Sequence, residues 1–230
     1  MHGAGVSETA AWLGLIGGYA WTVRSLARLA WEYDPELPVA AVDGGARSLR
    51  AIGSAHPVEV TRASVPKDGE GRIADLLTTE LVVASLEAGG RDDVIEALAL
   101  RLAACHPAVN AARLTEALRE REEQMTTAFG DGVAIPHARL DGLECTVAAF
   151  ARISGGIPWE SPDGQPTRLI FLLAGPTDQP RAHLKALADA SRLLSDTQCR
   201  ARLLEAAGEV ELLAVLREAE DLGLKKARAA

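Results

Sequence analysis

Residues 168–174 form a nearly continuous apolar run, Arg-Leu-Ile-Phe-Leu-Leu-Ala. A strand with one exposed face alternates polar and apolar residues, whereas a strand covered on both faces does not. The run therefore predicts a strand at the centre of a sheet. Such a strand needs helices to cover it, and the surrounding sequence has several amphipathic stretches that can do so.

Helix and strand patterns alternate from Arg72 onward. Strands are predicted over residues 80–86, 133–135, 146–153 and 168–174. Helices are predicted over 92–104, from a cap at Asn110 to the end of the charged run 119–123, from Pro180 to Leu194, from a cap at Asp196 to Leu204, and over 209–218. This alternation predicts an α/β fold, with a central β-sheet flanked by α-helices.

The first ~70 residues differ from the rest in composition and punctuation. They hold three of the four tryptophans, and residues 8–33 repeat apolar side chains at helical spacing. A short strand is expected over 39–42 and a linker over 64–71. We expect residues 1–71 to be a helical N-terminal extension, 72–222 the main domain, and 223–230 a flexible basic tail. Packing on its own domain is the favoured role for the extension, ahead of a dimer contact, membrane-surface binding or the remnant of a larger fused transporter.

Charge and cysteine content exclude several classes of protein. The net charge of −8 disfavours nucleic-acid binding, which needs a basic face. The three cysteines are far apart and form no Cys-x-x-Cys pair, which disfavours a disulfide framework or a zinc site and favours a reducing compartment. With no secretory signal or spanning helix recognised, a cytoplasmic location is expected. No phosphate-binding glycine motif for ATP or NAD occurs, so no cofactor is predicted.

The segment Gly-Asp-Gly-Val-Ala-Ile-Pro-His, residues 130–137, places His137 behind a proline at the end of a short predicted strand. Its imidazole is a candidate nucleophile near neutral pH. His183 falls in the first turn of the helix from Pro180, where unpaired N–H groups and the helix dipole favour an anion. Arg121 can hold two phosphate oxygens with its planar fork. Taken singly, each has an ordinary alternative: a histidine at a strand end, a histidine on a half-buried helix face, and a solvated charge run.

Together these pieces resemble the enzyme IIA domains of the bacterial phosphotransferase system, in the fructose, mannitol and nitrogen-regulatory class. The resemblance rests on Arg121-Glu122, Thr127, Gly130, Gly132, Ala134-Ile135-Pro136-His137, Ile157-Pro158-Trp159, Asp163-Gly164, Gly175-Pro176 and His183-Leu184. It implies a mixed central sheet flanked by helices.

The resemblance also implies roles for four residues. His137 would accept a phosphoryl group from the phosphocarrier HPr through Nε2, and His183 would support it. Arg121 and Thr127 would bind the phosphoryl group, with no metal. The next acceptor would be a cysteine on an enzyme IIB of a separate chain, for sugar uptake, so that any membrane association is through a transporter partner.

Two alternatives stay open from the sequence. The domain could be a nitrogen-type regulator that controls target proteins by its phosphorylation state, or a non-catalytic anion-binding scaffold. The segment departs from the family pattern where Ala128 replaces a glycine and where the bulky Phe129 follows. Asp131 either orients His137 or simply forms a turn.

Overall fold

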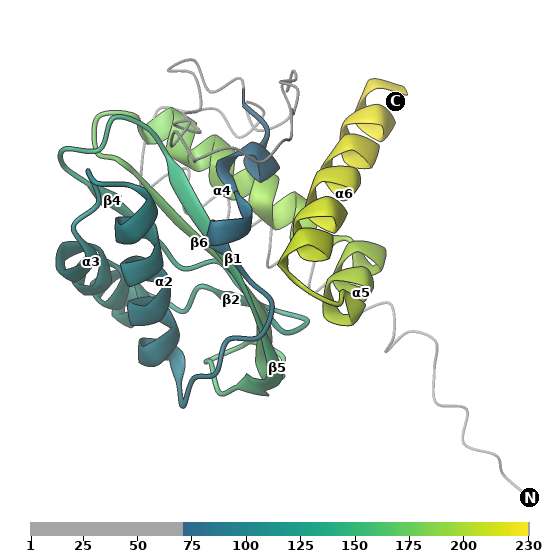
Figure 1. Cartoon of the computed structure of the whole chain (residues 1–230), viewed down its shortest axis with the longest axis horizontal. Helices are drawn as coiled ribbons and strands as arrows, with labels where there is room; N and C mark the ends of the chain where they lie inside the picture. The colour runs from purple at the N-terminus through teal and green to yellow at the C-terminus, as the bar shows by residue number, and fades with distance from the viewer. Residues whose placement is uncertain (1–70, 230) are drawn as a thin grey trace, which may run out of the picture. The chain divides into compact units, whose positions relative to one another are not determined.

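The computed structural model describes residues 71–229, with side chains through residue 224. The predictions for residues 1–70, including the helix over 8–33, the strand over 39–42 and almost all of the linker, lie outside the described residues. In the described part, helices flank a six-stranded mixed sheet (Figure 1), which confirms the predicted α/β class.

The helices are α2 (Arg91–Cys105), α3 (Ala111–Gln124), α4 (Pro180–Ser195), α5 (Thr197–Glu205) and α6 (Glu209–Ala229), with short 3-10 helices η2 (Ile73–Leu76) and η3 (Thr79–Leu81). The strands are β1 (Val82–Val83), β2 (Ala128–Gly130), β3 (Val133–Ala134), β4 (His137–Leu140), β5 (Val147–Ile157) and β6 (Thr167–Pro176).

The sheet is built around the antiparallel hairpin of β5 and β6. Its strand order is β1-β5-β6-β3-β2, and β4 also pairs with β6. β1 runs parallel to β5, β3 and β4 run parallel to β6, and β2 runs antiparallel to β3. The predicted central strand is therefore confirmed, because β6 has partners along both edges.

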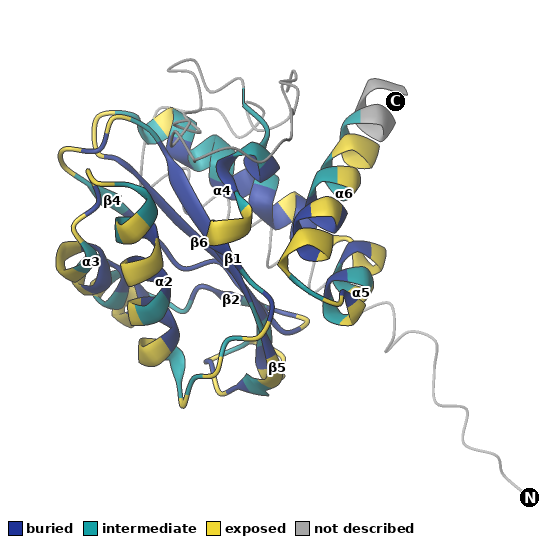
Figure 2. Ribbon diagram, in the orientation of Figure 1, coloured by how far each residue is buried: buried dark blue, intermediate teal, exposed yellow. Residues whose placement is uncertain are grey.

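Burial explains why β6 has a continuous apolar sequence. Every residue of β6 except Arg168 is buried. Phe150 of β5 lies opposite Phe171 of β6, and their rings meet edge to face with centroids 6.1 Å apart. Such a pair adds specific aromatic contact to the area that it buries. The sheet and the inner faces of the helices are buried, while the outer faces of the helices are exposed (Figure 2).

The helices begin where their capping residues predict. The Asn110 side chain accepts a hydrogen bond from the N–H of Arg113, 3.0 Å away, and Asp196 accepts one from Cys199 at 2.9 Å. Each side chain satisfies one of the N–H groups that a helix leaves unpaired at its start. Pro180 is the first residue of α4, where its missing N–H costs nothing.

The structure moves several predicted boundaries, among them the end of β5, which reaches Ile157, and two further corrections have a clear cause. The strand expected over 80–86 is only Val82–Val83, because the N–H of Ala84 donates to the Glu209 side chain, 3.2 Å away, and leaves the ladder. α6 continues to Ala229, so residues 223–229, expected as a flexible tail, are helical. The segment after Glu218 is rich in good helix formers and has no proline. No helix within residues 71–229 is long and apolar enough to cross a membrane.

Strands β2 and β4 were absent from the sequence prediction. β3 and β4 keep one register against β6, with Ala134 opposite Ile170 and His137 opposite Leu173. β3 and β4 are therefore collinear segments that pair with the same edge of β6. The pairing is interrupted at Pro136, because proline has no N–H to donate to the ladder. The Pro136 carbonyl still accepts a hydrogen bond from Leu173, 3.0 Å away.

Candidate functional site

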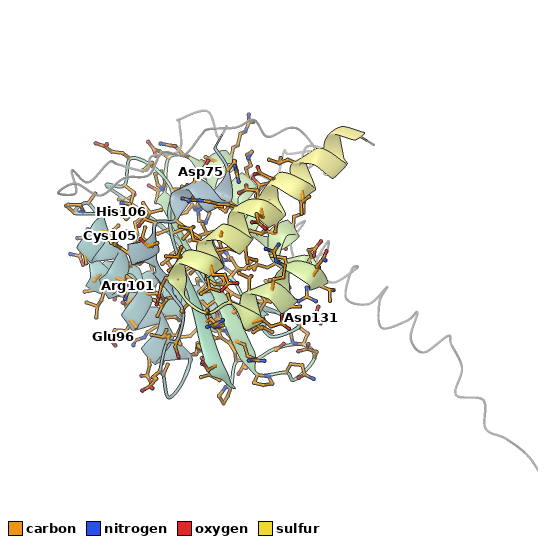
Figure 3. The ribbon with its side chains drawn as sticks, turned by 45° about the vertical axis from the view of Figure 1, so that its right-hand side comes forward. Asp75, Glu96, Arg101, Cys105, His106 and Asp131 are labelled. Atoms are coloured by element: carbon orange, nitrogen blue, oxygen red, sulfur yellow. The ribbon has the colours of Figure 1, made fainter. Side chains whose placement is uncertain are left out.

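The turn between β2 and β3 has a backbone that few residues can adopt. Gly130, Asp131 and Gly132 have φ of 103°, 53° and 72°. Glycine reaches this left-handed region without strain, and aspartate tolerates it better than most residues. The Asp131 carboxylate pairs with Arg200 of α5, 2.8 Å away, and the residue is marked in Figure 3. Asp131 is therefore a turn former tied to α5, and it does not orient His137.

His137 begins β4 and does not end the preceding strand, contrary to the sequence prediction. Its Nδ1 lies 2.8 Å from the carbonyl oxygen of Ile135. A carbonyl can only accept, so Nδ1 carries the proton and Nε2 carries the lone pair. Nε2 is buried and has no hydrogen-bond partner among the described residues.

The His183 ring lies beside the His137 ring. His183 is in the first turn of α4, and its N–H donates to the Gln179 carbonyl at 3.2 Å. The two imidazole centroids are 5.9 Å apart, with the rings tilted by 49°. The His183 ring occupies the space over Gly175, where an added Cβ would lie 2.5 Å from Nδ1. Because Gly175 has no side chain, the His183 ring on α4 can pack directly against β6.

Both histidines are kept uncharged at neutral pH. Burial, and then the positive charge of Arg121, lower the pKa of His137 to about 4, against the opposing effect of its hydrogen bond to Ile135. Burial, followed by His137 and Arg139, lowers the pKa of His183 to about 3. Buried imidazoles favour the neutral form because the charged form loses hydration. A neutral Nε2 has the lone pair that a nucleophile needs.

Arg121 is the cationic neighbour of His137. It lies in the last turn of α3, and its Nη1 donates to the Met125 carbonyl, 3.0 Å away. Its Nε is buried without a hydrogen-bond partner among residues 71–224. The guanidinium is thus held near the imidazole, and its buried Nε–H still has no acceptor among these residues.

Thr127 was expected to bind the phosphoryl group, but in the structure its donors contact the Glu122 carboxylate. Its N–H donates to Oε1 of Glu122 at 2.8 Å, and its hydroxyl donates to Oε2 of the same carboxylate. Trp159 donates its indole N–H to Oε1 at 2.7 Å. In this structure Thr127 therefore has no N–H or O–H left to donate to a phosphoryl group.

Sequence reasoning missed three residues of this site. Glu122 belongs to the quoted motif but was interpreted as part of a solvated charge run. Its hydrogen-bond partner Trp159 was given no role. Arg139 follows two residues after His137, so a correct prediction of β4 would have placed both on one face of the strand. Arg139 pairs in register with Gly175, the residue covered by His183.

Within residues 71–229, no three His, Cys, Asp or Glu side chains are placed so that they could hold a metal ion. What the fold brings together is two uncharged imidazoles and two guanidinium groups, a set suited to holding an anion.

Comparisons with known proteins agree with this geometry. Residues 75–219 match the family described as "Phosphoenolpyruvate-dependent sugar phosphotransferase system, EIIA 2". The chain is 40% identical over 131 residues to a nitrogen regulatory protein of Bradyrhizobium diazoefficiens, covering 57% of this chain and 85% of that protein. It is 32% identical over 147 residues to the fructose-specific EIIABC component of Bacillus subtilis, covering 64% of this chain but only 23% of that longer protein.

A solved structure shows the same fold. The crystal structure of nitrogen regulatory protein IIA-Ntr from Neisseria meningitidis superposes with a TM-score of 0.59 at 30% sequence identity, covering 63% of this chain and 98% of that one. The resemblance seen in the sequence is thus confirmed over the part that carries the sheet and its helices. Since the family match spans more than half of the 230 residues, this chain belongs to the EIIA type 2 family of the phosphoenolpyruvate-dependent sugar phosphotransferase system.

Proposed function

We propose that this protein is a phosphoryl carrier and that His137 is its acceptor. The observation that carries the proposal is the hydrogen bond from Nδ1 of His137 to the Ile135 carbonyl, 2.8 Å long. It assigns the lone pair to Nε2, the ring nitrogen without a hydrogen-bond partner among residues 71–224. His183 and Arg121 supply the polar and charged surroundings that a phosphoryl group needs.

The transfer is a displacement at phosphorus between two nitrogens. The Nε2 lone pair of His137 forms a P–N bond while the P–N bond of the donor, a phosphohistidine on HPr, breaks. The electron pair of the broken bond returns to the donor imidazole. The His137 ring then carries a proton on Nδ1 and phosphorus on Nε2, and its positive charge is stabilised by the Ile135 carbonyl.

The neighbours of His137 act on the charge of the group being transferred. Arg121 offsets part of the roughly −2 charge of the phosphoryl group. His183 contributes a neutral ring that can donate to a phosphoryl oxygen without adding charge of its own. Because Nε2 is buried, docking of the donor must first move the side chains that cover it.

The low pKa of His137 suits a carrier. At about 4, it leaves nearly all molecules with a neutral, nucleophilic imidazole at neutral pH. A weakly basic imidazole is also a better leaving group, so the same environment favours onward transfer. The acceptor in a sugar-uptake role would be a cysteine of an enzyme IIB on a separate chain.

A regulatory role is the second candidate. Nitrogen regulatory and fructose-specific relatives match at comparable identity, 40% for the former and 32% to 38% for the latter, and the chain spans 85% of the nitrogen regulatory protein. In this role the same phosphohistidine would control binding to a target protein. Transfer to a sugar-specific enzyme IIB favours transport, and phosphorylation that does not respond to sugar favours regulation.

Reconstituted phosphorylation tests the proposal. Incubation with phosphoenolpyruvate, enzyme I and HPr should give acid-labile phosphate on the wild type and none on His137→Ala. His183→Ala should still be labelled but should pass the group on more slowly. A matched control is His106→Ala, which removes a half-buried histidine at the C-terminal end of α2.

Two results would contradict the proposal. Label that persists in His137→Ala would move the acceptor elsewhere in the chain. A wild-type protein that takes no label under conditions that phosphorylate a known enzyme IIA would leave only the anion-binding scaffold.

A further inference from the structure

A series of hydrogen bonds connects the Glu122 carboxylate, through the backbone of Thr127 and Ile135, to Nδ1 of His137. We propose that Glu122 is a positioning residue that acts through this series to fix His137 in the tautomer with its proton on Nδ1. The inference rests on the proposed function of His137, because positioning matters only if Nε2 is the reacting atom. It assigns a role to a buried carboxylate that the transfer step itself does not use.

The contacts are direct at every step. The indole of Trp159 and the N–H of Thr127 both donate to Oε1 of Glu122, at 2.7 Å and 2.8 Å. The carbonyl of Thr127 accepts the N–H of Ile135 at 3.1 Å. The carbonyl of Ile135 in turn accepts Nδ1 of His137 at 2.8 Å. Two backbone carbonyls thus separate the Glu122 carboxylate from the imidazole.

Burial makes Glu122 an effective fixed point. The residue is only 3% exposed, and its carboxylate receives three donors from Thr127 and Trp159. Hydrogen bonds to an ionised acceptor are stronger than those between neutral groups, and a buried carboxylate without them would be costly. The carboxylate therefore helps to hold the connection between α3 and β2, whose residues 125–127 lie outside regular helix and strand.

The same side chain also restrains Arg121. Glu122 is the next residue on α3, and Arg121 donates to the Met125 carbonyl within the connection that Glu122 holds. A fixed connection therefore fixes the position of two groups: the Arg121 guanidinium beside the His137 ring, and the Ile135 carbonyl that selects the ring's tautomer. Loss of Glu122 should loosen the two together.

Three variants separate positioning from general stability. Glu122→Ala removes the acceptor. Glu122→Gln keeps an oxygen for the Thr127 N–H and the Trp159 indole, and its amide can donate to the Thr127 hydroxyl. Glu220→Ala is the matched control, because Glu220 is a partly buried carboxylate that accepts the N–H groups of Ile73 and Ala74 at 2.7 Å and 2.9 Å, with no hydrogen bond toward His137.

The main readout is nitrogen NMR of the His137 ring in the unphosphorylated full-length protein, assigned by loss of the signal in His137→Ala. Wild type, Glu122→Gln and Glu220→Ala should each show one tautomer with the proton on Nδ1. Glu122→Ala should show a mixture of tautomers, and its phosphorylation by HPr should slow by about 10²-fold, the usual cost of misplacing a reacting group by about 1 Å. Glu122→Gln should restore most of that rate.

A single Nδ1–H tautomer and a wild-type rate in Glu122→Ala would overturn the inference, and so would a Glu122→Gln protein that behaves like Glu122→Ala. If Glu122→Ala does not fold, Glu122→Asp keeps the carboxylate but withdraws it from the Thr127 N–H by one methylene, and an unchanged spectrum and rate in that variant would overturn the inference instead. The tautomer is measured without a phosphoryl donor. A wild type that shows the Nδ1–H tautomer but takes no label therefore refutes the proposed function, whereas a labelled His137 with an unaffected tautomer refutes only the positioning role.

Discussion

Acid should destabilise this fold through His137, and the size of the effect follows from its burial. An unfolded histidine has a pKa near 6.5, whereas burial and Arg121 lower the pKa of His137 to about 4. Between these two values the unfolded chain binds a proton that the native protein does not. The free energy of unfolding therefore falls as the pH falls from about 6.5 to about 4, and this contribution is fully present only above about pH 6.5.

The magnitude is large relative to typical stabilities. A difference of about 2.5 between the two pKa values, at about 1.4 kcal/mol for each pKa unit, amounts to about 3.5 kcal/mol. Proteins of this size are commonly stable by about 5–15 kcal/mol. The decrease in the free energy of unfolding caused by His137 should therefore be measurable at a pH well above that of general acid unfolding.

Urea unfolding of the wild type and His137→Asn at about pH 7, 6 and 5 isolates the effect. The asparagine amide can still donate to the Ile135 carbonyl, but it cannot titrate. The wild-type free energy of unfolding should fall more steeply than that of the variant, by up to about 1.4 kcal/mol per pH unit around pH 5. Parallel pH profiles for the two proteins would refute the claim that the His137 pKa is depressed in the native state.

Three further outcomes follow from the site and its supports. Gly175→Ala places a Cβ 2.5 Å from the His183 ring, so it should destabilise the fold by about 1–3 kcal/mol and slow onward transfer, as urea unfolding and a transfer assay would show. Arg121→Gln removes a charge that lowers the His137 pKa, so an NMR titration should show that pKa higher than in the wild type; an unchanged or lower value would mean that the guanidinium is not near the ring. Asp196→Ala removes the cap of α5 and should cost about 1 kcal/mol of stability while leaving phosphorylation unchanged, and a loss of labelling in the folded variant would contradict that separation.

The fold class was within reach of the sequence because its signals are local. The apolar run of β6 predicts a strand covered on both faces. Asn110 and Asp196 predict helix starts, because each side chain accepts a hydrogen bond from a backbone N–H only three residues further along the chain. The short strands were missed for the opposite reason. β2 and β4 exist because β3 and β6 offer edges to pair with, and a segment of three or four residues has too little pattern of its own.

The candidate site divides in the same way. The sequence by itself determined which chemical groups are available, since the Ile-Pro-His segment, His183 and Arg121 are all recognisable in the chain. Only the tertiary structure decided that the two imidazoles lie 5.9 Å apart, that Nδ1 of His137 faces a carbonyl, and that both donors of Thr127 turn toward Glu122. Proximity, burial and tautomer arise when separate elements pack over the sheet, and no local spacing in the chain encodes them.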